Sequence, residues 1–189
     1  MTKKILIPLI IGVLFILVLL VGVFTFNPNQ NNSEKNTGHD FTFIDCNGNR
    51  GHLKDYRGKV VILDMWATWC TPCQYQMLEL RKIYENYSRE DLEILSIDID
   101  PNEDLDTIKK FIELYNSYGY DLPWVFGKDD TGDIWRKYKV GTGGIPALCI
   151  FDRNGEMVFT NEGLSVYSDT PQGFPSNIKK LAPILDKLI

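Results

Sequence analysis

Two cysteines separated by two residues are the part of this chain best suited to chemistry. Cys70 and Cys73 lie in the stretch WATWCTPCQYQM, residues 66–77, with a tryptophan before them and a proline between them. A thiolate is a nucleophile and a metal ligand, and two thiols at this spacing can also close a disulfide. The pair is therefore compatible with a metal clamp, a structural bridge or a dithiol that exchanges electrons with other thiols.

The rest of the sequence favours the redox-active dithiol. Zinc sites usually take four ligands from paired motifs, whereas this chain has one CxxC, two scattered cysteines and only His39 and His52. A haem attachment motif needs a histidine directly after the second cysteine, where this chain has Gln74. We therefore expect neither a metal nor a cofactor. A permanent structural disulfide remains as the alternative to a reactive one.

The segments around the pair place it where a strand passes into a helix. Residues 58–68, GKVVILDMWAT, begin with β-branched apolar residues typical of a strand buried on both faces. Apolar residues then recur at helical spacing between residues 77 and 87. The N–H groups and dipole at a helix N-terminus stabilise a thiolate, so Cys70 is the expected nucleophile. Cys73, one turn further on, is the expected resolving thiol that breaks the mixed disulfide.

The remaining segments predict an α/β domain that starts near His39 and runs to Ile189. Strands alternating with helices, followed by a hairpin and a final helix, indicate a mixed sheet with helices on both faces. Asn-Gly turns end the first strand and join the two strands of the later hairpin. The expected elements are strands over residues 41–46 and 92–100, a hairpin over 145–163, and helices over 101–120 and 176–188.

The first 38 residues have a different character. Residues 1–26 carry Lys3 and Lys4 and then an uncharged apolar run, whose length as a helix matches the hydrocarbon core of a bilayer. The run is longer than a typical signal-peptide core, and no small-residue cleavage site follows, so we expect one uncleaved transmembrane anchor. A cleaved signal peptide is the alternative. The polar residues 27–38 predict a flexible tether.

The charge and composition exclude one class of partner. Hydrophobic residues make up 44% and charged residues 24% of the chain, which is ordinary for a globular protein. The formal net charge is -5, whereas binding to phosphate backbones needs a basic surface. No nucleic-acid partner is therefore expected. The two lysines before the apolar run predict a cytoplasmic N-terminus and an extracytoplasmic domain.

The motifs together resemble the thioredoxin superfamily, and in particular the membrane-anchored extracytoplasmic thiol-disulfide oxidoreductases of the cytochrome-c-maturation and sporulation type (redoxin or AhpC/TSA-like). The stretches FTFIDCNGNRGHLKDYRGKVVILDMWATWCTPC and GGIPALCIFDRNGEMV carry the resemblance, together with the anchor and tether. The resemblance covers residues 39–163 well and the last helix loosely. It implies a thioredoxin fold with an N-terminal β-hairpin and a central insertion over residues 101–126.

The resemblance also assigns roles to single residues. Cys70 and Cys73 match the redox pair, and Pro146 matches the loop proline whose peptide bond is cis. Ile145 would then offer its backbone to an extended substrate segment. Asp64, six residues before the first cysteine, matches a buried acid whose pKa burial raises and which can accept the proton of Cys73.

Further residues around the site have weaker assignments. Trp69, Thr71 and Pro72 are expected to face the substrate, whereas Trp66 better fits core packing. Glu103 is the nearest match to an active-site glutamate within the insertion, and a solvated acid at a helix start is the alternative. Ser96 stands near the place where thioredoxin has a lysine beside the buried acid, which leaves the proton route open.

Cys46 and Cys149 do not belong to the family pattern. One interpretation is a structural disulfide, because an extracytoplasmic domain permits one and the closed loop would be long. The other is a pair of buried free thiols, which pack as small apolar groups.

The sequence thus predicts a membrane-tethered thiol-disulfide oxidoreductase that acts on extracytoplasmic protein thiols and disulfides. The resemblance implies a reductase fed by an integral membrane thiol carrier. An oxidase or isomerase of the same fold is the nearest alternative, because spacing does not determine the reduction potential. A non-catalytic module that uses the fold to bind a partner is the second alternative.

Overall fold

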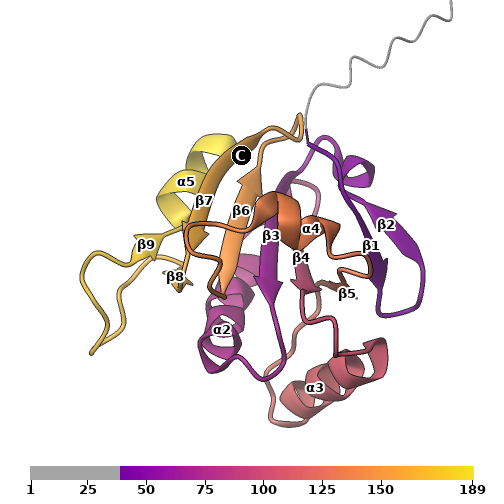
Figure 1. Cartoon of the computed structure of the whole chain (residues 1–189). Coiled ribbons are helices and arrows are strands. Elements are labelled where there is room, and N and C mark those ends of the chain that lie inside the picture. The colour runs from indigo at the N-terminus through magenta and orange to yellow at the C-terminus, as the bar shows by residue number, and fades with distance from the viewer. Residues whose placement is uncertain (1–38) are drawn as a thin grey trace, which may run out of the picture. The chain divides into compact units, whose positions relative to one another are not determined.

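The computed structural model describes residues 39–189, which fold around a seven-stranded sheet (Figure 1). The strands are β1 (Thr42–Asp45), β2 (Arg50–His52), β3 (Val60–Trp66), β4 (Leu92–Asp98), β5 (Val125–Lys128), β6 (Ala147–Phe151), β7 (Met157–Glu162), β8 (Ser165–Val166) and β9 (Lys179–Lys180). The helices are η1 (Leu53–Tyr56), α2 (Thr71–Asn86), α3 (Leu105–Ser117), α4 (Asp133–Tyr138) and α5 (Ala182–Leu188).

The large sheet is mixed, as the sequence predicts. Its order is β2-β1-β5-β4-β3-β6-β7, and β8 and β9 form a separate two-stranded sheet. β3 pairs in parallel with β4, and β4 in parallel with β5, because helical segments connect these strands. The terminal pairs β1–β2 and β6–β7 are antiparallel hairpins. The expected N-terminal hairpin and the later Asn-Gly hairpin are therefore confirmed.

β3 is the central element for the site. All seven of its residues are buried, as expected for a strand covered on both faces. Its side chains alternate between two cores, so that Val60, Ile62 and Trp66 face α2 while Val61 and Leu63 face the opposite side. This alternation assigns Asp64 to the α2 face, the same face as Cys73.

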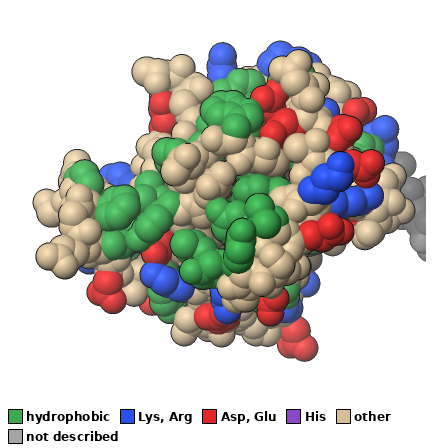
Figure 2. Space-filling model, turned by 90° about the horizontal axis from the view of Figure 1, so that it is seen from below, with side chains coloured by type: hydrophobic (Ala, Val, Ile, Leu, Met, Phe, Trp, Pro, Cys, Tyr) green, Lys and Arg blue, Asp and Glu red, His purple; other side chains and the backbone are tan. Residues whose placement is uncertain are grey.

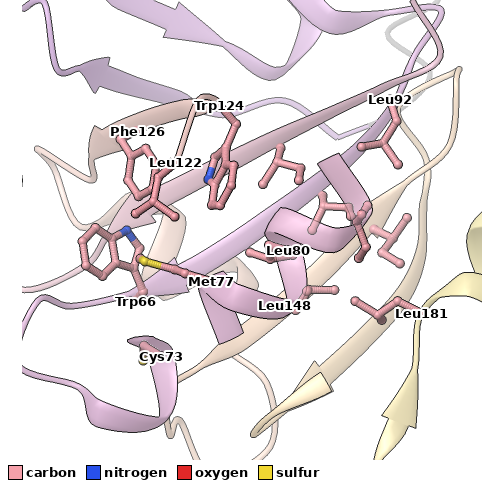
Figure 3. Packing of buried hydrophobic residues seen from close by; sticks show 14 of the residues in the cluster. Trp66, Cys73, Met77, Leu80, Leu92, Leu122, Trp124, Phe126, Leu148 and Leu181 are labelled. Carbon is pink, nitrogen blue, oxygen red and sulfur yellow. The ribbon is translucent and has the colours of Figure 1, made fainter. Parts of the chain in front are cut away.

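Two hydrophobic cores hold the sheet between layers of helices. On one face α2, α3 and α5 contribute side chains that include Met77, Phe111 and Leu185. Figure 3 shows part of this core, where Trp66, Met77 and Trp124 lie between the sheet and α2. On the other face η1 and α4 contribute Leu53, Ile134 and Tyr138. Helices on both faces are therefore confirmed.

The sequence interpretation differs from the structure at the C-terminal end. The helix expected over residues 176–188 begins only at Ala182, because the backbone before it pairs with β8. The N–H groups of Leu181 and Ala182 donate to carbonyl oxygens of Val166 and Tyr167, and Pro183 fits the first turn, which needs no N–H donor there. The sequence predicts neither β5 nor α4, because elements of four and six residues are too short to show a clear apolar period.

The candidate anchor, residues 1–26, and the tether, residues 27–38, lie outside the described residues. Within residues 39–189 no helix has the length and apolar character needed to cross a bilayer.

Candidate active site

The two cysteines of the CxxC motif form a disulfide at the N-terminus of α2. The S–S distance is 2.03 Å and the Cα atoms lie 5.2 Å apart, so the structure shows the oxidised form. Cys70 retains 4% exposure while Cys73 is completely buried. An external thiol can therefore reach the sulfur of Cys70 only. This asymmetry agrees with Cys70 as the exchanging sulfur and Cys73 as the resolving one.

Local structure explains why the first sulfur is reactive. Cys70 is the N-cap of α2, and the backbone N–H of Cys73 donates to its Sγ at 3.2 Å. Pro72 occupies the first turn, where a missing N–H costs nothing. When the disulfide opens, the thiolate of Cys70 faces N–H groups that no helical carbonyl satisfies. Thr71 and Pro72 are both exposed at this end of the helix.

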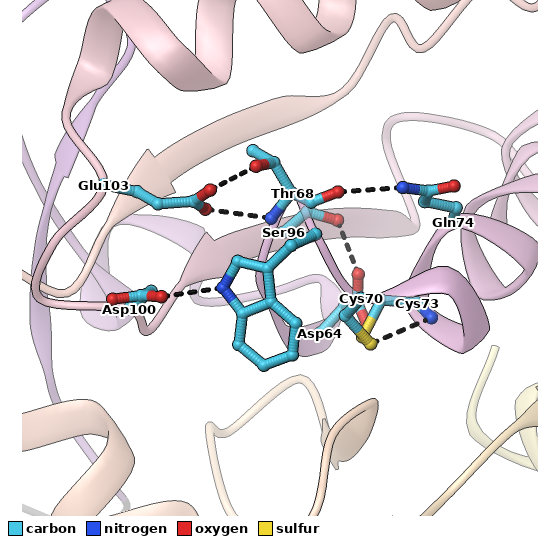
Figure 4. Close-up of a disulfide and its surroundings, with 9 residues drawn as sticks. Asp64, Thr68, Cys70, Cys73, Gln74, Ser96, Asp100 and Glu103 are labelled. Carbon is cyan, nitrogen blue, oxygen red and sulfur yellow. Dashed lines mark hydrogen bonds between the residues drawn. A yellow bond between two sulfur atoms is a disulfide. The ribbon is translucent and has the colours of Figure 1, made fainter.

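The two tryptophans of the motif have different environments. Trp69 is 63% exposed, and its Nε1 donates to Oδ2 of Asp100 at 2.7 Å (Figure 4). Trp66 is fully buried against Phe111 and Phe126. Trp66 therefore belongs to the core, as the sequence predicts, whereas Trp69 is exposed and its contact with a substrate stays a prediction.

Asp64 is the buried acid of the site. Ser96 Oγ donates to its Oδ2 at 2.9 Å, and Trp124 Nε1 donates to Ser96 Oγ at 3.0 Å. Oδ1 of Asp64 has no hydrogen-bond partner within residues 39–189. Burial raises the pKa of Asp64 to about 7, opposed by the hydrogen bond from Ser96. The carboxyl can therefore take up or release a proton near neutral pH.

A second group of acidic residues lies under the loop that precedes the disulfide. Glu103 accepts hydrogen bonds from the backbone N–H of Thr68, at 2.9 Å, and from its hydroxyl. Gln74 Nε2 donates to the carbonyl oxygen of Thr68 at 2.8 Å (Figure 4). Burial, followed by a hydrogen bond to Glu103, raises the pKa of Asp98 to about 8.

The alternative interpretation of Glu103 as a solvated acid at a helix start is wrong. Asp104 is the N-cap of α3, since its side chain accepts the N–H of Thr107. Glu103 is half-buried and reaches the backbone two residues before Cys70. Its contacts make it a positioning residue for the Trp69–Cys70 loop.

The loop before β6 has the expected cis peptide bond, between Ile145 and Pro146. A carboxylate that sequence reasoning missed holds this loop. Glu162 on β7 accepts hydrogen bonds from Thr142 N at 2.7 Å, Thr142 Oγ1 at 2.6 Å and Gly144 N at 3.0 Å. These bonds, from the Thr142 side chain first, lower the pKa of Glu162. A Cβ on Gly141, at φ +56°, would lie 1.9 Å from the Glu162 carboxylate.

The backbone of Ile145 is available to another chain. Within residues 39–189 neither its N–H nor its C=O takes part in a hydrogen bond. Its neighbour Pro146 instead accepts the N–H of Gly163 at 2.8 Å, which ties the loop to the end of β7. Ile145 packs against the same core as the two cysteines, and free backbone groups there are what an extended substrate segment needs for strand-like pairing.

The interpretation of Cys46 and Cys149 as a disulfide is wrong. Both are free thiols, and they pack in different cores on opposite faces of the sheet. Burial raises the pKa of Cys46 to about 11 and of Cys149 to about 12. Their thiolates are therefore scarce at neutral pH, and both act as small apolar groups. Within residues 39–189 no three His, Cys, Asp or Glu side chains gather in a way that could ligate a metal.

Comparisons with known proteins agree with this geometry. The model of the AhpC/TSA family matches residues 35–160. The thiol-disulfide oxidoreductase ResA of Geobacillus thermodenitrificans is 31% identical over 140 residues, which cover 74% of this chain and 75% of the relative. ResA of Geobacillus kaustophilus is 34% identical over 121 residues, or 64% of each chain.

Solved structures give the same result for the fold. The thioredoxin domain of a thiol-disulfide oxidoreductase from Bacteroides vulgatus superposes with a TM-score of 0.55 at 28% identity, covering 67% of this chain and 86% of that one. StoA from Bacillus subtilis has 18% identity and a TM-score of 0.55, and the match covers 68% of this chain and 90% of StoA. At this identity it supports the fold alone. The chain therefore belongs to the AhpC/TSA family of the thioredoxin superfamily and is a thiol-disulfide oxidoreductase.

Proposed function

We propose that this protein is a membrane-tethered reductase of disulfides in extracytoplasmic proteins, with apocytochromes or other secreted proteins as substrates. The observation that carries the proposal is the disulfide itself, in which Cys70 keeps a small exposed area and Cys73 is fully buried. In the reduced enzyme the Cys70 thiolate attacks a substrate disulfide, forms a mixed disulfide and releases one substrate thiolate. Cys73 then attacks the sulfur of Cys70 and releases the second substrate thiolate, which leaves the enzyme oxidised.

The charges around the motif support the reducing direction. Strongly oxidising members of this fold have a stabilised thiolate in the reduced form. Here the carboxyl groups of Asp100 and Glu103 contact the loop before Cys70, and negative charge there disfavours a thiolate. Lys128, a cationic side chain in this region, donates to the backbone carbonyl of Glu103. A less stable thiolate makes the dithiol more reducing.

The apolar run of residues 5–26 supports the tether, and Lys3 and Lys4 support a cytoplasmic N-terminus. An enzyme oxidised outside the cytoplasm needs electrons from the other side of the membrane, so its donor is an integral membrane thiol carrier. A membrane-impermeant maleimide applied to intact cells tests the topology. Labelling of Cys70 after mild reduction is expected, and labelling only after lysis would contradict the extracytoplasmic placement.

The equilibrium reduction potential of the Cys70–Cys73 pair tests the direction. The full chain in detergent is equilibrated with dithiothreitol or glutathione buffers, and the fraction of disulfide is measured by alkylation and mass spectrometry. A value near that of thioredoxin, about -270 mV, is expected. A value near about -120 mV would instead identify an oxidase. Full cellular function of the double variant Cys70→Ser, Cys73→Ser would indicate a non-catalytic binding module.

A further inference from the structure

A groove of about 590 Å³ lies directly beside the disulfide, and neither the exchange chemistry nor the fold requires it. It extends from the first turn of α2 to the segment that connects β8 and β9, residues 167–178. Its volume falls in the range of sites that hold a small ligand or several side chains. The apolar residues that line it are Pro72, Tyr75, Leu164, Phe174, Pro175 and Ile178.

The strand that follows Leu164, a residue of the groove lining, is held against α2 by specific contacts. Gln76 on α2 accepts the backbone N–H of Ser165 at 2.8 Å, and Glu79 accepts that of Tyr167 at 2.9 Å. Both side chains are buried, and buried polar groups need hydrogen-bond partners. Their bonds to the backbone hold β8 against α2. These contacts fix the start of the segment that supplies Phe174, Pro175 and Ile178 to the groove.

Two aromatic rings in contact with each other line the groove. The ring of Phe174, in the β8–β9 segment, lies 5.0 Å from the ring of Tyr75, measured between centroids. Phe174 remains 37% exposed, so part of its face is open to a ligand. Figure 2 shows apolar side chains gathered on this side of the molecule, over the lower end of α2 and the neighbouring C-terminal segment.

The groove is continuous with the place where a substrate must sit. Thr71 and Pro72, the two residues between the cysteines, form one end of it. Glu162 also lines it and at the same time holds the loop before the cis proline. A polypeptide bonded to Cys70 and paired with the backbone of Ile145 is therefore positioned to place a nearby side chain in the groove, since an extended chain spans about 3.4 Å per residue.

We propose that this groove is a subsite for a large apolar side chain, close in sequence to the reactive cysteine of an extended protein substrate. The proposal rests on the proposed function, because it names which substrates the disulfide exchange favours. Proteins whose reactive cysteine has an aromatic or large aliphatic neighbour are then preferred over those with polar neighbours. Phe174 and Tyr75 would contact the apolar side chain and so favour these substrates.

A trapping experiment tests the proposal with the full chain in detergent. In the Cys73→Ser variant, the Cys70 thiolate attacks a peptide–thionitrobenzoate disulfide, so that the Cys70–peptide disulfide forms and thionitrobenzoate leaves with the electron pair. Peptides with Phe one, two or three residues before or after cysteine each compete with the matching Ser peptide. Mass spectrometry gives the ratio of the two products. Both peptides react with the same Cys70 thiolate, so the reactivity of Cys70 cancels in this ratio.

At one of these positions we expect the Phe peptide to be favoured about tenfold, which equals about 1.4 kcal/mol. Phe174→Ala and Tyr75→Ala should each reduce the ratio to about twofold, and Phe174→Leu should restore most of it. Leu114→Ala is the matched control, because Leu114 is an exposed apolar residue on α3, away from the groove, and this variant should keep the wild-type ratio.

The outcomes separate this proposal from the proposed function. A ratio below about twofold at every position, or an unchanged ratio in both aromatic variants, would overturn the subsite while the reduction potential still decides the direction of exchange. A full chain that dimerises in light scattering, and dissociates on Phe174→Ala, would make a second copy the occupant and also overturn it. No product with any peptide would overturn both.

Discussion

Ser96 donates a hydrogen bond to Asp64 at the point where β3 and β4 run parallel, and the two residues are direct partners in the register. Both side chains face α2, where Cys73 is buried. A hydroxyl therefore stands near the place where the resemblance to thioredoxin leads one to expect a lysine. A hydroxyl stabilises the carboxylate through one neutral hydrogen bond, whereas a lysine would do so with a full charge.

Asp64→Asn should slow the second step of exchange, in which Cys73 attacks the mixed disulfide. With a pKa of about 7, the wild-type carboxyl is ionised above that pH and can accept the Cys73 proton. We expect the wild-type rate to fall as pH drops through about 7, and the variant to be slower by about tenfold or more at pH 8. Stopped-flow release of thiol from a preformed mixed disulfide measures this rate, and an identical pH profile in the variant would contradict the role.

The same carboxyl should make stability depend on pH. Its pKa is raised from 3.8 to about 7, so the native state favours the neutral acid, and this contribution is complete below pH 3.8 and lost as pH rises through 7. Asn keeps the shape without the charge. At pH 8, Asp64→Asn should therefore raise the free energy of unfolding by a few kcal/mol (about 2–4). Urea unfolding of the oxidised protein at pH 4 and pH 8 provides the comparison, with little difference expected at pH 4.

Ser96→Ala should shift the pH dependence of the second exchange step to higher pH. Ser96 opposes the effect of burial on Asp64, so removing its hydroxyl raises the pKa of Asp64 above about 7. The midpoint of the second exchange step should then shift to higher pH, and the rate at pH 7 should fall. Trp124→Phe should raise the pKa of Asp64 less, because Trp124 donates to Ser96 and not to Asp64 itself. Carboxyl titration by NMR measures the pKa of Asp64, which should be highest in Ser96→Ala, intermediate in Trp124→Phe and lowest in the wild type.

Glu103→Gln should act on Asp98 and on the loop before the disulfide. Burial and then Glu103 raise the pKa of Asp98 to about 8, so the substitution should lower it. Gln can still accept the N–H of Thr68, whereas Glu103→Ala removes this bond and leaves the N–H without its partner. We expect Trp69 fluorescence and the reduction potential to change more in the Ala variant than in the Gln variant. Equal effects would show that charge alone matters.

Glu162→Gln should loosen the loop that carries the cis proline. The carboxylate accepts three hydrogen bonds from Thr142 and Gly144, and an amide has one acceptor oxygen and a donor in their place. Faster hydrogen exchange of residues 141–145 and a higher KM for protein disulfides are expected, with little change in the reaction with small disulfides. Since its pKa lies below the usual value, the wild-type loop should lose this support only in acid.

Two thiols should be found in the oxidised protein. Cys46 and Cys149 are free, so denaturation without reductant should expose two groups to iodoacetamide and peptide mapping should find both alkylated. In the native state they should react slowly, because burial raises the pKa of each thiol. Recovery of a peptide pair linked through Cys46 and Cys149 would refute this assignment.

The sequence by itself determined the chemistry and the general architecture. Two cysteines at this spacing, after a β-branched strand and before a helical pattern, indicate a dithiol at a helix N-terminus, and the structure confirms this position. These features depend on short-range patterns, namely the period of apolar residues and the turn residues between segments. The apolar period of α2 does not predict that its polar residues Gln76 and Glu79 are buried, nor that they bind the backbone of another segment.

Only the tertiary structure decided which distant residues meet. Sheet order places Cys46 and Cys149 in different cores, brings Ser96 beside Asp64, and sets Glu162 under the loop before Pro146. It also turns residues 179–180 into a strand within a pattern that is helical by spacing. Contacts between segments far apart in the chain are set by packing and hydrogen bonding of the whole sheet, which local residue spacing does not encode.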